Sequence, residues 1–225
     1  MNRLAIVLLF EFVILSTHNG YADSDLHIAL KGGLDAAVLD HEFRENRYDF
    51  SGGATGYFQG SVSDKFSLAG QMDVLYVPRG ANVVVEGEKQ GEFRHRYIDL
   101  MAAVRPGMQL GPMSIYLLLG GELNLLVSAT LVDGTGSQQD ITSDLRRIDV
   151  ALLGGAGVGL HLPRQNLGPF HLDTVFLEAR HDIGLLDTFH NTSDFKNRTS
   201  SIMLGLSFVV GGSAVPAPAP AGTVQ

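Results

Sequence analysis

Apolar and polar side chains alternate with a period of two through eight separate stretches of the chain, between residues 26 and 210. Successive side chains of a β-strand point to opposite faces, so this period predicts strands, and no stretch has a sustained helical period. At about ten residues or more, each predicted strand is long enough to cross a bilayer at a tilt. The predicted strands are residues 26–38, 52–63, 65–77, 96–107, 112–127, 146–162, 170–184 and 197–210.

The connections between these strands alternate between two kinds. Three are short, at Ser63 and Asp64, at 108–112 and at 163–169, whereas the four others are long and polar, at 40–51, 78–93, 128–145 and 185–197. An even number of strands with short turns at one rim and long loops at the other is typical of outer-membrane barrels. The sequence therefore predicts an all-β fold, an eight-stranded antiparallel up-and-down transmembrane β-barrel with short periplasmic turns and long extracellular loops.

The two faces of the predicted strands differ in charge. Only the apolar face is compatible with lipid, because hydrocarbon offers no hydrogen-bond partners to polar groups. The other face then lines a lumen that is just wide enough to be filled by side chains, where charges must pair or be hydrated. We expect a paired lumen charge network of four cations and seven anions: Lys31, Asp35, Asp73, Asp99, Arg105, Glu122, Arg147, Asp149, Glu178, Arg180 and Asp182.

Aromatic residues are expected to form girdles at the two membrane interfaces. Phe66, Phe170 and Phe208 fall close to the short-turn rim, and Tyr76 and Tyr97 approach the long-loop rim.

The two ends of the chain differ from the barrel. Residues 1–22 combine Arg3, an apolar stretch from Leu4 to Leu15 and the small residues Gly20 and Ala22, which is typical of a signal peptide. An apolar stretch of about 12 residues is shorter than the roughly 20 that a membrane-spanning helix needs. We expect residues 23–211 to form the exported barrel and the Ala- and Pro-rich residues 212–225 to form a disordered tail.

Composition excludes several kinds of chemistry. The chain has no Cys, which excludes disulfides and thiolate catalysis, and its net charge of −8 argues against nucleic acid as a partner. No calcium loop is present in "DGTGSQQDITSD" and there is no pair of histidines at helical spacing, so we expect no metal and no cofactor.

Four glycines lie within six residues of "DVALLGGAGVGLHL" and suggest a phosphate loop. A dinucleotide fingerprint starting at Gly155 would need a third glycine at Leu160, and Pro163 prevents the helix that would have to follow. We predict instead that Gly155, Gly157 and Gly159 face the lumen and make room for larger neighbours, namely Tyr116, Glu122 or Arg180.

Two catalytic alternatives remain. A Ser–His pair on the lipid face would need a hydroxyl beside His181, such as Ser200 or Ser201, but a rim histidine is the favoured interpretation. The other histidines considered are His161, His171 and His190. Asp73, Asp99, Glu122 and Glu178 resemble an acid–base cluster, yet interleaved arginines favour salt bridges. We therefore expect no catalytic residues and no enzymatic activity.

Residues 26–210 resemble the PorT-like outer-membrane β-barrel domain of Gram-negative bacteria, which shares its architecture with the small OmpA and OmpX barrels. The similar segments, in order, are "SVSDKFSLAGQMDVLYVPRGA", "RYIDLMAAVRPG", "YLLLGGELNLL", "RRIDVALLGGAGVGL" and "FLEARHDIGLLD". The chain differs at His181, where the family usually has Tyr, and at Gly120-Gly121, where Gly-Pro is common. The resemblance implies an eight-stranded barrel in the bacterial outer membrane and no agreed activity.

These features predict a structural or interaction protein, a plugged monomeric barrel that presents loops outward. Its expected partners are outer-membrane lipid, lipopolysaccharide and the barrel-insertion machinery. Bases in the loops at 40–50 and 86–97 either contact lipopolysaccharide phosphates or belong to solvated loops of both signs. These bases are Arg44, Arg47, Lys89, Arg94 and Arg96.

Three alternatives to this function stay open. The first is a narrow pore for ions or small solutes, and the second is a lipid-modifying outer-membrane hydrolase. The third is a soluble lipocalin-like barrel that turns its apolar face inward.

Overall fold

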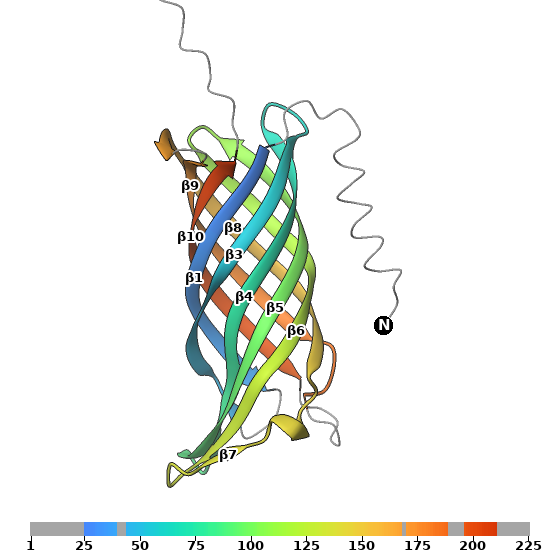
Figure 1. Ribbon diagram of the computed structural model, residues 1–225, viewed down its shortest axis with the longest axis vertical. Coiled ribbons are helices and arrows are strands. Elements are labelled where there is room, and N and C mark those ends of the chain that lie inside the picture. The colour runs from blue at the N-terminus through green and yellow to red at the C-terminus, as the bar shows by residue number, and fades with distance from the viewer. Residues whose placement is uncertain (1–24, 40–43, 168–169, 189–195, 211–225) are drawn as a thin grey trace, which may run out of the picture.

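The computed structural model shows one closed β-sheet and describes residues 25–39, 44–167, 170–188 and 196–210 (Figure 1). The predicted signal peptide (residues 1–22) and the predicted tail (212–225) lie outside the described residues.

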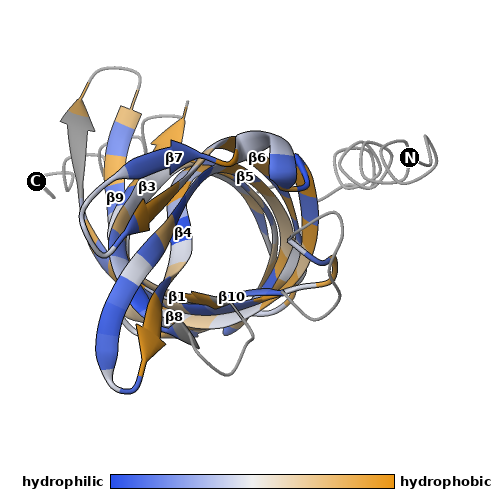
Figure 2. Cartoon of the chain, turned by 90° about the horizontal axis from the view of Figure 1, so that it is seen from below, coloured by the Kyte–Doolittle hydropathy of each residue, from blue (hydrophilic) through white to orange (hydrophobic). Residues whose placement is uncertain are grey.

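Eight long strands form the wall. Each pairs antiparallel with its neighbour in the chain, and the last strand pairs with the first from Leu26 opposite Val210 to Leu39 opposite Asn197, which closes the ring. Figure 2 looks into this ring along the barrel. The prediction of an all-β, eight-stranded antiparallel barrel is confirmed. The long strands are β1 (Asp25–Leu39), β3 (Arg47–Ser61), β4 (Phe66–Val85), β5 (Glu88–Leu110), β6 (Met113–Asp133), β8 (Ile148–Leu167), β9 (Phe170–Gly184) and β10 (Asn197–Val210).

Three short elements lie at one end of the barrel. The strand β2 (Arg44–Glu45) pairs with β4, β7 (Gln138–Asp140) pairs with β6, and the 3₁₀ helix η1 spans Thr142–Asp144. We call this the hairpin end. The opposite end, called the turn end, carries the tight connections at 62–65 and 111–112. In the described part of the chain, no helix is long and apolar enough to span a membrane.

Three of the four long connections, at 40–51, 78–93 and 128–145, are shorter than the alternation pattern predicts. Most of the expected loop at 78–93 is strand, because β4 and β5 stay paired up to the tight turn at Glu86 and Gly87, both at positive φ. Similarly, β3 begins at Arg47 and β6 continues to Asp133. Beyond the membrane the outward face of a strand meets water instead of lipid, so the outward side chains become polar and the alternation ends while the backbone pairing continues. These three predicted loops are therefore in large part extended hairpins (Figure 1).

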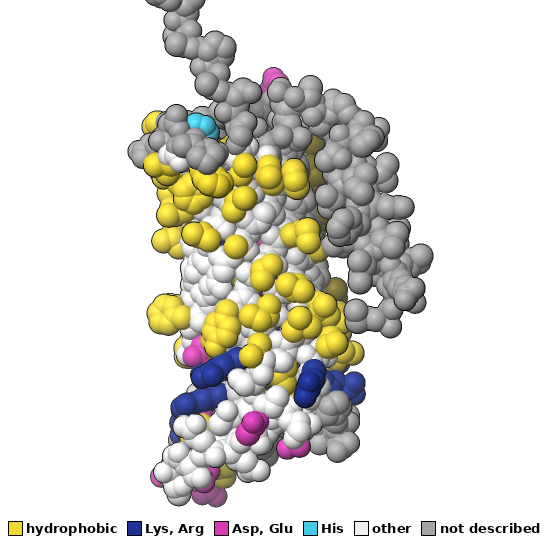
Figure 3. All heavy atoms as spheres, viewed as in Figure 1, with side chains coloured by type: hydrophobic (Ala, Val, Ile, Leu, Met, Phe, Trp, Pro, Cys, Tyr) yellow, Lys and Arg dark blue, Asp and Glu magenta, His cyan; other side chains and the backbone are white. Residues whose placement is uncertain are grey.

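The exterior of the barrel is apolar and its interior is charged. Leu30 and Ile202 are 62% and 60% exposed on the outside, whereas Asp35 and Asp73 are 1% and 2% exposed. On the face that Figure 3 shows, apolar side chains cover much of the barrel, and Lys and Arg side chains lie just beyond them toward the hairpin end. This sidedness contradicts the alternative of a soluble barrel with an apolar interior, because the apolar face would then be solvated.

A β-bulge explains why the first half of β9 is out of phase with the rest. Ser207 of β10 pairs with Thr174, but the next residue, Phe208, pairs with Leu172. Asp173 is thus an extra residue, and its insertion shifts the inward and outward positions by one.

Candidate functional site

The lumen contains many buried charged side chains. Two ion clusters lie in it. An arginine is also held between two tyrosine rings, and two groups of apolar side chains fill much of the remaining space.

The first cluster, here called the Lys31 cluster, joins β1, β4 and β9 through two cations and two anions. Lys31 Nζ donates to Asp73 Oδ2 at 2.5 Å and to Glu178 Oε1 at 3.3 Å. Arg180 Nη2 donates to the same Asp73 oxygen at 2.5 Å, and its Nε donates to Glu178. Each carboxylate thus meets both cations, so these four buried charges balance one another.

The second cluster, the Arg79 cluster, lies around a guanidinium that is 2% exposed. Arg79 Nη2 donates to Asp99 Oδ2 at 2.6 Å and to Glu122 Oε2 at 3.3 Å. In the amide orientation that satisfies both of its polar atoms, Asn124 donates to Asp99 at 3.1 Å and accepts from Arg79 Nη1 at 2.9 Å. One cation therefore serves two carboxylates and an amide from neighbouring strands.

Further carboxyl groups surround this cluster. Asp35 and Asp182 line a small cavity together with Asp99 and Glu122, and its volume of about 10 Å³ has room for roughly one water molecule. Asp149 accepts hydrogen bonds from the Val150 amide at 2.8 Å and from the Asn197 side chain at 3.3 Å.

A third feature lies nearer the turn end, where Arg105 contacts the rings of Tyr57 and Tyr116; we call it the Arg105 clamp. The Arg105 guanidinium carbon lies 3.7 Å from the centroid of the Tyr116 ring and 4.4 Å from that of Tyr57. On the other side of Tyr57 the ring of His27 stacks at 4.4 Å, and the Tyr57 hydroxyl bonds with Ser207 at 2.7 Å. Cation–π contacts of this kind strengthen when water is excluded. The clamp thus spans the lumen from β1 to β6.

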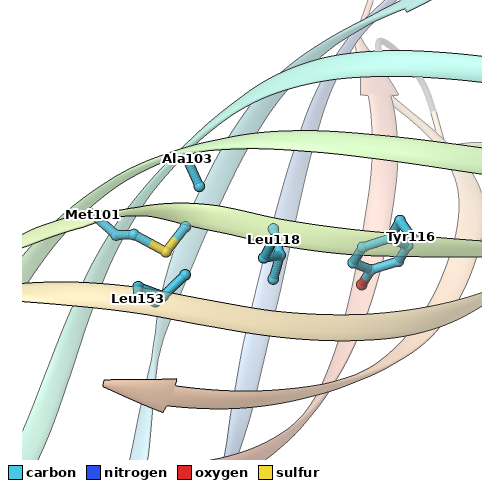
Figure 4. Packing of buried hydrophobic residues seen from close by; sticks show 5 residues of the cluster. All are labelled: Met101, Ala103, Tyr116, Leu118 and Leu153. Carbon is cyan, nitrogen blue, oxygen red and sulfur yellow. The ribbon is translucent and has the colours of Figure 1, made fainter. Parts of the chain in front are cut away.

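Apolar side chains fill much of the remaining interior. Figure 4 shows Met101, Leu118, Leu153 and Tyr116 packed together inside the wall, with Ala103 beside them. A second group consists of Leu75, Val77 and Met203. The interior is therefore a packed core with embedded ion clusters, as an eight-stranded barrel allows.

The structure places ten of the eleven predicted lumen residues in the buried interior. They do not form one network: four make the Lys31 cluster, Asp99 and Glu122 bind Arg79, and Arg105 stands in its clamp. Arg147 was predicted wrongly, because it is exposed and precedes β8, which starts at Ile148. The period of two indicates which face a residue takes within a strand, but it does not show where the strand begins.

One basic and one aromatic residue toward the hairpin end, Arg79 and Tyr97, were assigned incorrectly. Arg79 was missed because Pro78 and the polar residues after it indicated a loop, although Pro78 lies within β4 opposite Arg96. Tyr97, expected in the outer girdle, is 1% exposed inside the barrel with Arg79 5.5 Å from its ring centroid. Counting along each strand, both residues fall at positions that face inward, and this was the signal that could have placed them.

The glycine cluster of β8 lies against large lumen side chains, as predicted. A Cβ at Gly157 would meet the Tyr116 ring at 2.3 Å, and one at Gly155 would lie 3.4 Å from the Arg180 Cγ. Glu122, also named as a neighbour, does not occupy this space; Ser114 and Thr174 face Gly159 instead. These glycines leave room for side chains rather than for a phosphate.

Of the histidines considered above, His181 lies on the outer face and His161 near the turn end, whereas His190 lies outside the described residues. His181 Nδ1 and Ser200 Oγ are 2.9 Å apart on the outer face, whereas Ser201 is buried in the lumen. Near the turn end, Asp173 Oδ2 lies 3.6 Å from His161 Nδ1 and 3.9 Å from His27 Nδ1. No group of three or more His, Asp or Glu side chains within the described ranges is arranged to hold a metal ion.

The closed sheet and its apolar exterior define a membrane-spanning β-barrel. No family model matches the chain, and no curated protein matches it.

Several solved structures of outer-membrane proteins have a similar fold. Ail of Yersinia pestis, in complex with the heparin analogue sucrose octasulfate, is 15% identical over 82% of this chain and 99% of its own, with a TM-score of 0.38. Neisserial surface protein A is 14% identical over 82% and 96%, with a TM-score of 0.41. OprG from Pseudomonas aeruginosa is 11% identical over 81% and 95%, with a TM-score of 0.39. At these values the similarity concerns barrel architecture alone.

Proposed function

We propose that this chain is an integral outer-membrane β-barrel protein of the PorT-like type, with a structural or interaction role and a lumen closed by its own side chains. The packing of the lumen carries this proposal. The Lys31 cluster, the Arg79 cluster and the Arg105 clamp each bridge different strands across the interior. The extended hairpins then form the part of the protein that is offered to partners outside the cell.

A narrow pore is the first alternative. Conduction requires a hydrated path, whereas the interior cavity beside the Arg79 cluster has room for about one water molecule. Opening a path would mean separating Arg79 from Asp99, or Lys31 from Asp73, and each separation leaves buried charges without partners. The closed state is therefore the expected resting state.

A lipid-modifying hydrolase is the second alternative, and the hydrogen bond between His181 and Ser200 is the observation that favours it. A serine nucleophile also needs a group that orients the histidine and donors for an oxyanion. His181 forms its hydrogen bond with Ser200, and the positions opposite these two residues are Gly154 and Ala36. These neighbours supply no carboxylate, so the non-enzymatic role is the better supported one.

The exposed bases at the hairpin end support lipopolysaccharide as a partner. Arg94 and Arg96 continue the outward row of β5 beyond Ile98, and Arg198 begins the outward row of β10. They belong to the side of the apolar belt where Figure 3 shows Lys and Arg side chains gathered. Bases at this height face anionic headgroups, each contributing on the order of 1 kcal/mol to binding. Folding through the insertion machinery and a monomeric state complete the proposal.

Recordings from purified protein in planar bilayers test the closed lumen. We expect no channel events at neutral pH. Reproducible unitary conductance from heat-modifiable, folded protein would overturn the closed-lumen role and support the pore. Mass spectra of lipid A with and without expression test the hydrolase, which predicts the loss of an acyl chain, whereas we expect identical spectra.

A further inference from the structure

An apolar groove of about 640 Å³ crosses the outer wall of the barrel from β4 and β5, near the turn end, over β6, β8 and β9 to β10. Its floor is made of small residues, Ala156 and Ala179, which lie opposite each other on β8 and β9. Larger side chains, among them Leu117, Leu177 and Ile202, stand around them. The volume lies within the roughly 300–1,000 Å³ of ligand sites, and the lining is apolar.

Polar groups lie just beyond the groove on the side of the hairpin end. Two positions beyond Ala179 and Ile202 on the same outward faces are His181 and Ser200, hydrogen-bonded at 2.9 Å. Gly154 stands opposite His181, and a Cβ there would meet nothing within 4 Å, so the space beside the imidazole is open.

The next outward position on β10, toward the hairpins, is the exposed Arg198. Along this wall the surface therefore changes from an apolar groove to a polar pair and then to a cation. An amphiphile with an apolar chain, a polar linkage and an anionic headgroup has the same order of groups.

We propose that this site binds one lipid A molecule: an acyl chain lies in the groove, the His181–Ser200 pair hydrogen-bonds to the linkage of that chain, and Arg198 pairs with a phosphate. The inference rests on the proposed outer-membrane location, which makes the hairpin end extracellular. The polar pair then lies in the outer leaflet, where lipid A is the anionic lipid. His181 thus has a binding role on the lipid face, one that requires no catalytic step.

Native mass spectrometry of protein purified from outer membranes in mild detergent tests this site. We expect wild-type protein to retain one lipid A through the detergent wash. Ala179→Phe fills the floor of the groove and should lower the retained lipid A at least fivefold. The matched control Ala54→Phe adds the same ring to the outward face of β3, away from the groove, and should retain lipid A as wild type does. The double variant His181→Ala/Ser200→Ala should also lose lipid A, and Ile28→Ala/Leu30→Ala, on the outer face of β1, should not.

Equal retention by wild type, Ala179→Phe and Ala54→Phe would overturn the proposal, since the lipid would then be general boundary lipid. Retention of phospholipid in place of lipid A would also overturn it. A heat-modifiable band is measured for each preparation, because it reports membrane insertion independently of the groove. Wild type that inserts but keeps no lipid A contradicts the groove alone, whereas wild type that does not insert contradicts the proposed function.

Discussion

The Tyr116 ring lies directly against Gly157 on the neighbouring strand, so that a Cβ built on this glycine would be 2.3 Å from Tyr116 Cζ. Because Gly157 has no side chain, the tyrosine can extend over β8 toward Glu178 of β9. There it supports the Arg105 guanidinium at 3.7 Å, and its hydroxyl donates to Glu178 at 3.3 Å. A single glycine in β8 thus links the Arg105 clamp to the Lys31 cluster.

Replacing Gly157 by leucine should therefore prevent Tyr116 from taking its place in the lumen. Overpacking of this kind costs about 1–3 kcal/mol and occasionally more. We expect a large loss of heat-modifiable, folded barrel in refolding assays. The control is Gly154→Ala, three residues away, where a Cβ meets nothing within 4 Å and folding should be unchanged. Normal folding of Gly157→Leu would contradict this packing.

Arg79→Met removes the cation of the Arg79 cluster and leaves Asp99 and Glu122 buried without it. Removing one partner from a buried ion pair costs about 3–5 kcal/mol. We expect this loss in the free energy of unfolding, measured by urea titration in lipid vesicles. The triple variant Arg79→Met/Asp99→Asn/Glu122→Gln should recover most of it, because the carboxylates are neutralised too. Arg147→Met, at an exposed position, should change stability by less than about 0.5 kcal/mol; an equal effect of both single variants would count against the cluster.

The double variant Arg94→Gln/Arg96→Gln tests the contact of the hairpin end with lipopolysaccharide. Each base near an anionic surface contributes about 1 kcal/mol, so each removal should weaken binding roughly fivefold. Binding to lipopolysaccharide micelles should also become less sensitive to salt. Lys65→Gln, at the exposed turn end, should leave the affinity unchanged. Unaltered affinity in the double variant would show that these bases are only solvated.

Asp133, the last residue of β6, should titrate below its ordinary value because the turn that follows binds its carboxylate. The Thr135 hydroxyl donates to its carboxylate at 2.6 Å and the Ser137 amide at 2.9 Å, and these hydrogen bonds lower the pKa of Asp133 from 3.8. Since the lowered pKa belongs to the folded turn, the carboxylate stabilises it fully above pH 3.8. This contribution is lost as the pH falls through the lower folded value. NMR titration of the carboxyl carbon measures the midpoint; Thr135→Val should raise it, and a wild-type midpoint at or above 3.8 would refute the arrangement.

The period of two predicted the barrel wall well wherever one face of a strand meets lipid. For the last two strands, 170–184 and 197–210, the predicted limits are those of β9 and β10. The pattern failed beyond the lipid. There Arg79 of β4 and Tyr97 of β5 continue the inward-facing rows of their strands, although the outward residue next to each on the hairpin side is no longer apolar and does not mark a strand. Pairing of individual charges was not predictable either. Which carboxylate meets Arg79 depends on the stagger between neighbouring strands, and alternation along one strand carries no information about that stagger.

Fractionation of expressing cells, combined with electrophoresis before and after boiling, tests most directly that the apolar face of this barrel is in a membrane. We predict a band in the outer-membrane fraction that requires detergent for extraction and changes its mobility on boiling. A soluble periplasmic band that is extracted without detergent and migrates alike before and after boiling would contradict the membrane-spanning barrel.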